Sequence, residues 1–572
     1  MHGRRGNLRA WMDGVLTLPL VLPPTVVGFC LLLAFGRRSP LGLALEHIGV
    51  MVVFSWPATV IAATVVAFPL MYRTALAGFE QVNPTLLDAA RTLGVSEWTV
   101  FRRILLPLAA PAVVAGTVLA FARALGEFGA TLMLAGNIPG RTQTIPIAIF
   151  SAVEDGNMAL ASFWVSLIVV ISIAMIRLLN LSGSVIKKQR NKGVLSAPHS
   201  LEAEIRPAPK SNQLDFAALL QVNLCKELDG FNLRVNLQTG KGALGLLGAS
   251  GAGKSMTLRM IAGIAHPDSG RIILNNRVLF DSDERLNTPA AKRKIGVVFQ
   301  DYALFPHLTV AENVGFGLMK MPENASRLRV DRLLNLLHIS ELASRFPREL
   351  SGGQRQRVAV ARCLAIEPDA LLFDEPFAAL DPHLRRQTEE QLRETLSDYR
   401  GAVIFVTHDM QEAFRFCSDL AVLDEGCVIA SGPRNELFDQ PRTVATAQLT
   451  GCKNIVSARP SKPDAIWVQS WGCELVSSFP VPDSLTHIGV RSHQILLQQS
   501  PERENTFPCW LMEMSEAPHE VTLYLHLHTE PQNGDSAQLQ ADIPKEAWHA
   551  LRIQAQPWRI TFDPARLLLL QG

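Results

Sequence analysis

The sequence has almost no net charge and no closely spaced cysteines. Its 572 residues carry 54 Lys and Arg against 52 Asp and Glu, a formal net charge of +2, so no overall electrostatic field attracts the chain to nucleic acid. The eight cysteines are scattered and form no Cys-x-x-Cys pair. This spacing argues against a disulfide framework and a structural zinc site, and it fits a reducing compartment for the soluble part.

Charge is also nearly absent from long stretches of the first 180 residues. Residues 14–35 and 49–72 contain no charged side chain, and the weaker runs 106–125 and 161–180 each hold one arginine near an end. At a rise of about 1.5 Å per residue, each run can cross a hydrocarbon layer of roughly 30 Å. Buried core helices of a soluble protein are the alternative, but they rarely come four in succession. Residues 1–181 are therefore predicted to form an all-α transmembrane bundle.

Lys and Arg are shared unevenly between the segments that flank these runs. With four spans and both ends on one side, that side holds eleven of these residues, and the other holds only Arg37, Arg38 and Arg141. The positive-inside rule then places both termini and the central loop in the cytoplasm. We expect a multi-pass protein of the cytoplasmic membrane, in contact with lipid.

The central loop carries a charged segment, DAARTLGVSEWTVFRRILLPLAAP (88–111), between two apolar runs. Its first part predicts a short amphipathic helix, with Leu86, Ala89, Ala90 and Leu93 on one face, that ends at Gly94. Such a helix either lies in solvent as part of the loop or forms a docking surface for another domain. The choice depends on what the rest of the chain contains.

Residues 182–213 are polar and rich in Ser, Pro and Lys, which predicts a linker. A hydrophobic strand then precedes GASGAGKS, the complete GxxxxGKS phosphate-binding loop. Its glycines let backbone N–H groups surround a phosphate at a helix N-terminus, Lys254 reaches the terminal phosphates, and the Ser255 hydroxyl can bind Mg²⁺. The loop comprises Gly248, Ala249, Ser250, Gly251, Ala252, Gly253, Lys254 and Ser255.

Four further motifs follow in a fixed order. They are VVFQD with Gln300, LSGGQ with Ser351, Gly352, Gly353 and Gln354, ALLFDEP with Asp374 and Glu375, and VTHD with His408. Together with the phosphate loop they resemble the ATP-binding cassette (ABC) superfamily over residues 214–445. The resemblance implies an α/β P-loop ATPase domain that binds ATP and Mg²⁺.

The family resemblance also implies a role for each motif residue. Glu375 would be the general base for the attacking water, and His408 would contact the γ-phosphate. Ser255, Gln300 and Asp374 would hold Mg²⁺. The signature residues Ser351 to Gln354 would act in trans on the nucleotide held by a second subunit, so a homodimer is implied. Asp381 fits the D-loop that links the two sites, and Phe231 is a candidate for stacking on the adenine.

The central loop of the apolar region resembles the EAA loop of binding-protein-dependent importers, over residues 88–107. The matching residues are Asp88, Ala89, Ala90 and Gly94, with Asp in place of the usual Glu. In these importers the loop helix docks on the ATPase. Since exporters of the superfamily lack this loop, the resemblance implies transport into the cell.

Residues 12–180 look like the molybdate permease subunit, most specifically in LGEFGAT (125–131) and NIPG (137–140). TGCKNI (450–455) is similar to molybdate-type ATPase subunits. The resemblance implies a permease and ATPase in one chain that import molybdate or tungstate, delivered by an extracytoplasmic binding protein. Another oxyanion such as sulfate is the alternative, and so is a truncated copy whose ATPase is uncoupled from transport.

In that family a further transmembrane helix precedes the region matching residue 12, so Met1 would fall in a basic cytoplasmic loop. A start upstream of Met1, a natural form with four spans and an impaired copy are all compatible with this. Glu127, close to a span, is either a gate or docking contact or an interface residue.

Residues 446–572 alternate in the manner of β-strands. In EVTLYLHLH, the side chains of Val521, Leu523, Leu525 and Leu527 fall on one face. GVRSHQI (489–495) resembles the small β-barrel (TOBE-like) accessory domain that follows importer ATPases. We therefore expect an all-β C-terminal domain, and regulation by bound oxyanion is a hypothesis for it.

Overall fold

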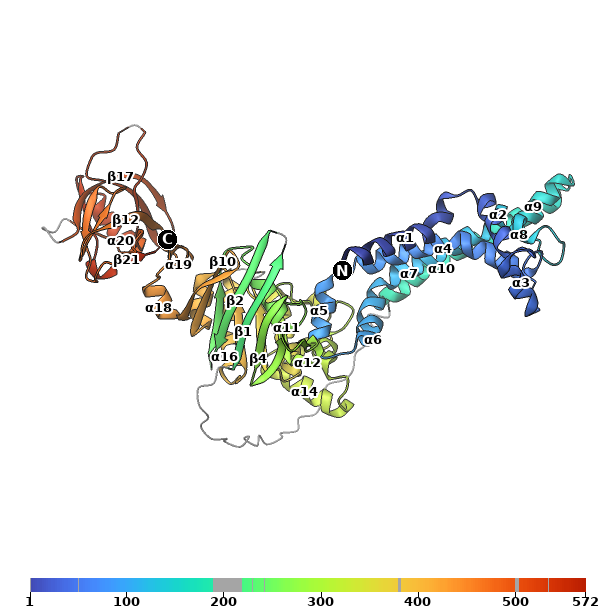
Figure 1. The fold of residues 1–572 in the computed structure, drawn as a ribbon, viewed down its shortest axis with the longest axis horizontal. Helices are drawn as coiled ribbons and strands as arrows, with labels where there is room; N and C mark the ends of the chain where they lie inside the picture. Colours follow the sequence, from blue (N-terminus) through green and yellow to red (C-terminus); the bar gives the residue numbers. More distant parts are fainter. Residues whose placement is uncertain are drawn as a thin grey trace. The chain divides into compact units, whose positions relative to one another are not determined.

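The computed structural model describes residues 2–49, 51–188, 219–228, 230–240, 242–378, 382–498, 504–532 and 534–571 (Figure 1). It divides into two compact units. The first comprises the described residues of Met1–Leu87 and Glu97–Ile205, and the second comprises those of Asp88–Ser96 and Arg206–Gly572. Residues 88–96, from the centre of the apolar region, thus belong to the same unit as the soluble domains.

The first unit is helical. Helices α4 and α7 pack along each other, and α8 packs against α2 and α4 (Figure 1). The helices are α1 (His2–Val21), α2 (Pro24–Phe35), α3 (Pro40–His47), α4 (Trp56–Glu80), α6 (Glu97–Val100), a π-helical turn (Phe101–Leu105), α7 (Leu106–Leu125), α8 (Gly129–Ala135), α9 (Ile145–Glu154) and α10 (Met158–Lys188).

Three stretches of these helices are long and apolar enough to cross a membrane: Trp56–Glu80, Glu97–Leu125 and Met158–Met175. The candidate span over 14–35 is broken rather than continuous. That run is split into α1 and α2, which meet at an angle of 119°. Pro23 and Pro24 lie at the break. Proline cannot donate a helix hydrogen bond and disfavours a helical conformation of the residue before it, so the two prolines interrupt the helix. Residues 2–13, expected to be a loop, belong to α1.

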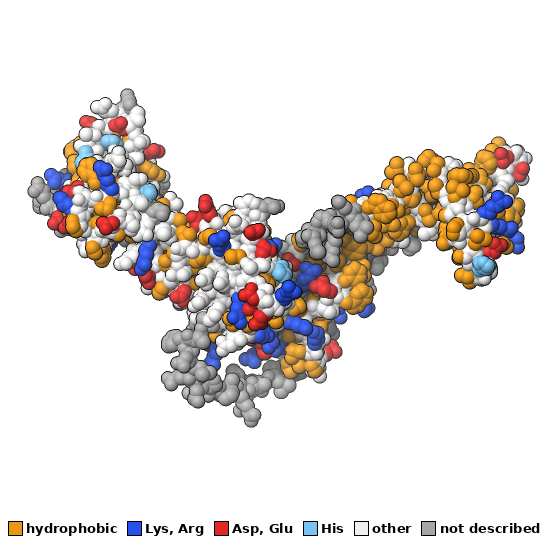
Figure 2. All heavy atoms as spheres, viewed as in Figure 1, with side chains coloured by type: hydrophobic (Ala, Val, Ile, Leu, Met, Phe, Trp, Pro, Cys, Tyr) orange, Lys and Arg blue, Asp and Glu red, His pale blue; other side chains and the backbone are white. Residues whose placement is uncertain are grey.

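The surface of the first unit is dominated by hydrophobic side chains along the helices, as Figure 2 shows. On α10, exposed residues include Phe163 (59%), Val170 (62%) and Ile173 (53%). Soluble proteins rarely expose apolar surface of this extent, whereas lipid-facing helices require it. The expectation of an all-α membrane-type bundle is confirmed.

The ATPase domain of the second unit is built on an eleven-stranded sheet in the order β6-β5-β4-β1-β2-β11-β10-β3-β9-β8-β7. Strands β10, β3, β9, β8 and β7 run parallel to one another. The strands are β1 (Leu220–Leu228), β2 (Phe231–Thr239), β3 (Ala243–Leu247), β4 (Ser269–Leu274), β5 (Arg277–Asp281), β6 (Leu286–Asn287), β7 (Ile295–Val298), β8 (Ala370–Asp374), β9 (Ala402–Val406), β10 (Asp419–Asp424) and β11 (Cys427–Pro433).

Helices cover this sheet and leave a core of Val, Leu, Ile and Phe side chains between them, including the stacked pair Phe373 and Phe405. The second unit contains α5 (Pro84–Thr92) from Asp88 onward. Its other helices up to the accessory domain are α11 (Lys254–Ala262), α12 (Ala290–Arg293), α13 (Val310–Gly315), α14 (Glu323–Leu336), α15 (Gly352–Ala365), α16 (Pro382–Ser397), α17 (Met410–Phe416), α18 (Arg434–Asp439) and α19 (Val444–Leu449).

The C-terminal domain consists of two five-stranded sheets, β14-β13-β12-β15-β21 and β16-β20-β17-β18-β19. In β18, Val521, Leu523, Leu525 and Leu527 are all at most 1% exposed, which confirms the predicted alternation. The elements are β12 (Asn454–Lys462), β13 (Ala465–Val468), β14 (Cys473–Val476), β15 (His487–Val490), β16 (Leu496–Gln498), β17 (Thr506–Glu516), β18 (Glu520–Leu527), β19 (Leu539–Pro544), α20 (Lys545–Leu551), β20 (Trp558–Thr561) and β21 (Leu568–Leu570).

Two predicted boundaries fall inside helices. Helix α10 continues to Lys188, so the linker predicted from residue 182 begins within it, and the remaining part, 189–213, lies outside the described residues. The boundary predicted at 445/446 falls within α19, and the first strand of the C-terminal sheets begins at Asn454. The polar run therefore did not locate the end of the preceding helix.

Candidate functional site

The motif residues gather at one edge of the parallel part of the sheet. The phosphate loop follows β3, His408 follows β9, Asp374 ends β8, and Gln300 follows β7. Since these four strands are parallel neighbours, their carboxyl ends meet at the same edge. Ligands of open α/β sheets bind at this edge.

The phosphate loop needs glycine at two positions. Gly253, directly before α11, has φ 101°, a left-handed conformation that other residues rarely adopt. At Gly248 a Cβ atom would lie 2.2 Å from the Leu423 carbonyl oxygen. The Lys254 Nζ donates hydrogen bonds of 2.8 Å to the carbonyls of Gly248 and Ala249, and burial lowers the pKa of its ammonium group. The loop thus holds a buried cation at a helix N-terminus, which is the arrangement that binds phosphate.

Ser255 and Asp374 form the part of the site suited to a metal. The Ser255 hydroxyl donates a 2.8 Å hydrogen bond to Asp374 Oδ1. Burial raises the pKa of the Asp374 carboxyl, and the Ser255 hydrogen bond opposes that shift. Gln300 lies exposed at the end of the neighbouring strand β7. Hydroxyl, carboxylate and amide oxygens are the hard donors that Mg²⁺ prefers, so the three residues fit this ion.

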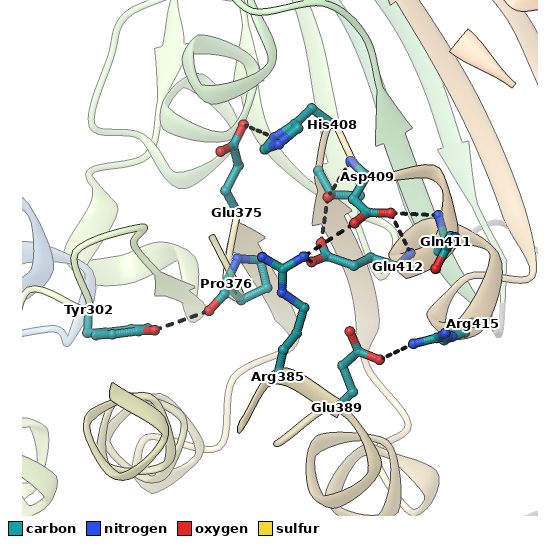
Figure 3. Close-up of polar contacts among 11 residues, drawn as sticks. Tyr302, Glu375, Pro376, Arg385, Glu389, His408, Asp409, Gln411, Glu412 and Arg415 are labelled. Carbon is teal, nitrogen blue, oxygen red and sulfur yellow. Dashed lines mark hydrogen bonds and ion pairs between the residues drawn. The ribbon is translucent and has the colours of Figure 1, made fainter. Parts of the chain in front are cut away.

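Glu375 and His408 face each other, with 3.3 Å between Glu375 Oε1 and His408 Nδ1 (Figure 3). Glu375 has φ 44°, an uncommon backbone conformation for a residue other than glycine. Its N–H donates to the Val406 carbonyl of β9, which fixes it against the strand that leads to His408. Strain of this kind is typical of functional positions.

A polar network that the sequence analysis did not predict supports the loop after His408 (Figure 3). Arg385 of α16 lies 3.4 Å from Asp409 and 3.6 Å from Glu412. Asp409 caps α17 by accepting from the backbone N–H groups of Gln411 and Glu412, and the Thr407 hydroxyl donates to Glu412. The network therefore joins α16 to the segments on both sides of His408. The sequence signal that could have indicated part of this network is Asp409, because an aspartate directly before a helix commonly accepts hydrogen bonds from backbone N–H groups two and three residues later.

The signature residues begin α15. Ser351 is the N-cap, and its hydroxyl and the Gln354 side chain form a reciprocal capping box. Gly352 and Gly353 occupy the first turn. Among the residues that the structure describes, no hydrogen bond or ion pair joins this helix start to the phosphate loop of the same chain. The geometry is compatible with the predicted action in trans. Asp381, the predicted D-loop residue, lies outside the described residues.

Phe231 lies beside the phosphate loop. A cavity of about 670 Å³ is lined by Phe231, Arg234 and Cys427, by the loop residues 249–252, and by Asp424 and Glu425. The Phe231 ring comes within 3.4 Å of the position that a Cβ atom at Gly253 would take. An aromatic face adjoining the phosphate loop is where a base attached to the bound phosphates would stack.

We expect Phe231→Ala to weaken ATP binding about tenfold, since stacking of a base on an aromatic ring contributes about 1–3 kcal/mol. Equilibrium titration of the purified dimer with ATP would measure the dissociation constant. Phe479→Ala, at a 45% exposed phenylalanine of the C-terminal domain, is the matched control. An unchanged dissociation constant for Phe231→Ala would exclude Phe231 as the stacking residue.

Residues 88–96 of the central loop belong to the same compact unit as the ATPase domain and contact it. Helix α5 buries Ala89 and Ala90, Leu93 is 3% exposed, and Gly94 ends the helix with φ 82°. A Cβ at Gly94 would lie 3.2 Å from the Ala291 carbonyl, and Lys320 donates to the Gly94 carbonyl at 3.4 Å.

Two further contacts fix the same segment. Leu93 lies against Gly317, where a Cβ would come within 3.3 Å of the Leu93 carbonyl. Burial raises the pKa of Asp88, and Arg91 and Arg259 of α11 counteract that shift. The predicted helix is present, and Ala89, Ala90 and Leu93 of its predicted apolar face are buried together with Asp88 and Thr92.

Comparison with known protein families finds a match for the helical first part of the chain and another for the part that carries the phosphate loop. Residues 231–378 match the family described as "ABC transporter", and residues 2–188 match "Binding-protein-dependent transport system inner membrane component". A probable sulfate/thiosulfate import ATP-binding protein CysA of Chlorella vulgaris is 44% identical over 241 residues, which are 41% of this chain and all of that protein. This chain belongs to the ABC transporter family.

Two other relatives show the range of this similarity. The sulfate/thiosulfate import ATP-binding protein CysA of Thermosynechococcus vestitus is 34% identical over 339 residues, 58% of this chain and 93% of that protein. The Fe(3+) ions import ATP-binding protein FbpC of Haemophilus influenzae is 41% identical over 222 residues, 38% of this chain and 62% of that protein.

The chain is thus an ABC importer in which permease and ATPase are fused. It is an ATP-hydrolysing, multi-pass protein of the inner membrane whose ATPase domain is cytoplasmic, and this architecture implies a periplasmic substrate-binding protein and dimerisation. The names of these relatives do not include molybdate, which was the expected substrate.

Proposed function

We propose that this ABC importer carries a tetrahedral oxyanion of the sulfate type, sulfate or thiosulfate, into the cell as a homodimer. The observation that carries the proposal is the similarity of its ATPase domain to sulfate/thiosulfate import proteins, one of which it matches over that protein's whole length. The strand-edge site described above supplies the residues that an ATP-driven importer needs.

In the proposed cycle the residues of this site act on ATP and water. Lys254 neutralises the terminal phosphates, and His408 contacts the γ-phosphate. Glu375 accepts the proton of the attacking water, and Ser351 of the second subunit closes the site through the start of α15. Mg²⁺ bound by Ser255, Gln300 and Asp374 would supply charge neutralisation at the phosphate oxygens.

Molybdate or tungstate is the second candidate, because the permease segments 125–131 and 137–140 resemble the molybdate permease. The ATPase-domain similarity favours sulfate over molybdate, because the relatives above include sulfate/thiosulfate importers and no molybdate importer, but it does not identify the substrate by itself. A relative named for iron import is 41% identical to it, close to the 44% of a sulfate relative. A substrate is selected where it is bound, and the ATPase domain meets only ATP.

The test is uptake by the dimer in vesicles of phosphatidylethanolamine and phosphatidylglycerol, with ATP inside and a substrate-binding protein outside. Radioactive sulfate with a sulfate-binding protein and radioactive molybdate with a molybdate-binding protein are compared. ATP-dependent sulfate uptake supports the first proposal. Uptake of molybdate alone would show that molybdate, and not sulfate, is the substrate. Uptake of neither anion would contradict oxyanion import.

A further inference from the structure

The helical unit contains a cavity of about 710 Å³ between α4, α7 and the segment that leads from α8 into α9. Most of its wall is apolar, but four threonines and one glutamine also line it. These polar residues are Thr59, Thr64, Thr131, Gln143 and Thr144. They bring hydroxyl and amide groups together in a region that is otherwise suited to lipid.

One of these hydroxyl groups is buried without a hydrogen-bond partner among the described residues. Thr144 Oγ1 is buried and forms no hydrogen bond with the described residues. Thr131 is only 1% exposed and lines the same cavity. A buried hydroxyl without a partner costs free energy, so a ligand that accepts a hydrogen bond from it would recover that cost.

The N-terminus of α9 lies at the same wall. Thr144 is the N-cap of this ten-residue helix, yet its side chain does not cap the backbone. Ile145 and Pro146, the first two helical residues, also line the cavity. Because the start of a helix carries partial positive charge, this end of the cavity favours an anion.

Glu127 is the one ionisable residue among those that line the cavity, and its carboxylate is already paired. Oε2 accepts from Arg123 at 2.9 Å, and Oε1 accepts from the Ala130 backbone N–H at 2.8 Å. The side chain is 1% exposed. These contacts give Glu127 a structural role, in which it holds the start of α8 near Thr131 and its charge is balanced by Arg123.

We infer that this cavity is a transit site for the oxyanion, in which Thr131, Gln143, Thr144 and the start of α9 donate hydrogen bonds to the substrate oxygens. The inference rests on the proposed function and locates it in the permease. Neutral donors around a dianion hold it without the strong attraction of a buried arginine. A substrate that has to be released benefits from such weak binding.

The test is the double variant Thr131→Val/Thr144→Val, which keeps the side-chain shape and removes both hydroxyls. Sulfate, thiosulfate and molybdate uptake is measured in the phosphatidylethanolamine and phosphatidylglycerol vesicles, together with ATP hydrolysis stimulated by the loaded binding protein. We expect uptake of the transported anion per ATP hydrolysed to fall about tenfold. Stimulated hydrolysis should stay within about twofold, because the motor and its docking are unaltered.

Two controls make the result decisive. Thr17→Val removes a hydroxyl of α1 that donates to the Asp13 and Gly14 carbonyls of its own helix and does not line the cavity, and it should change nothing. Thr131→Ser/Thr144→Ser restores both hydroxyls and should recover uptake. Unchanged uptake in the double Val variant, or an equal loss in the Ser variant, would overturn the transit site. Failure of the unmodified protein to take up any of the three anions would instead contradict the proposed function.

Discussion

Replacing Glu375 by Gln is expected to abolish ATP turnover while ATP still binds and holds two ATPase domains together. The glutamine keeps the shape of the side chain that ends beside His408, 3.3 Å away, but it cannot accept a proton. Loss of a general base costs about 10²–10⁴-fold in rate. Lys254, which is hydrogen-bonded within the phosphate loop, and the Ser255–Asp374 pair are unaltered, so nucleotide affinity should persist.

The measurement is steady-state phosphate release, together with ATP retained by the dimer after rapid gel filtration. Glu390→Gln, at an exposed carboxylate of α16, is the matched control and should behave as the unmodified protein. Normal hydrolysis by Glu375→Gln would remove Glu375 from the role of base. Loss of ATP binding would instead make it a residue that holds the site together.

Motifs whose residues lie close in sequence were predictable, since a few consecutive positions fix their geometry. The phosphate loop and the start of α15 depend on local backbone and capping rules. The alternation in β18 depends only on the pleat of a strand. In the structure an apolar strand precedes each of Asp374, His408 and Gln300 and brings them to one edge of the sheet.

Features that depend on side chains distant in sequence were not predictable. Arg385 meets Asp409 and Glu412 only because α16 packs beside α17, and no pattern around residue 385 indicates that contact. The angle of 119° between α1 and α2 was missed for a different reason. Proline in a membrane run is compatible with a kink or with a complete break, and packing against neighbouring helices selects between them.

Coupling between the ATPase and the permease is the second point at which a single change should have a large effect. Leu93 is 3% exposed, and it packs against Gly317 within the same unit as the nucleotide site. The polypeptide on both sides of residues 88–96 belongs to the helical unit. This segment is therefore a route by which a movement of the ATPase domain can be passed to the helices on both sides of it.

We expect Leu93→Asp to uncouple the two activities, because a buried carboxylate without a partner costs at least about 1–3 kcal/mol and displaces the segment from its contact. ATP hydrolysis in the absence of binding protein should remain within about twofold, since the nucleotide site is unaltered. Substrate uptake and the stimulation of hydrolysis by loaded binding protein should both fall at least about tenfold. Leu328→Asp, at a 72% exposed leucine of α14, should leave all three rates unchanged. Uptake that survives Leu93→Asp would show that force reaches the permease through another contact.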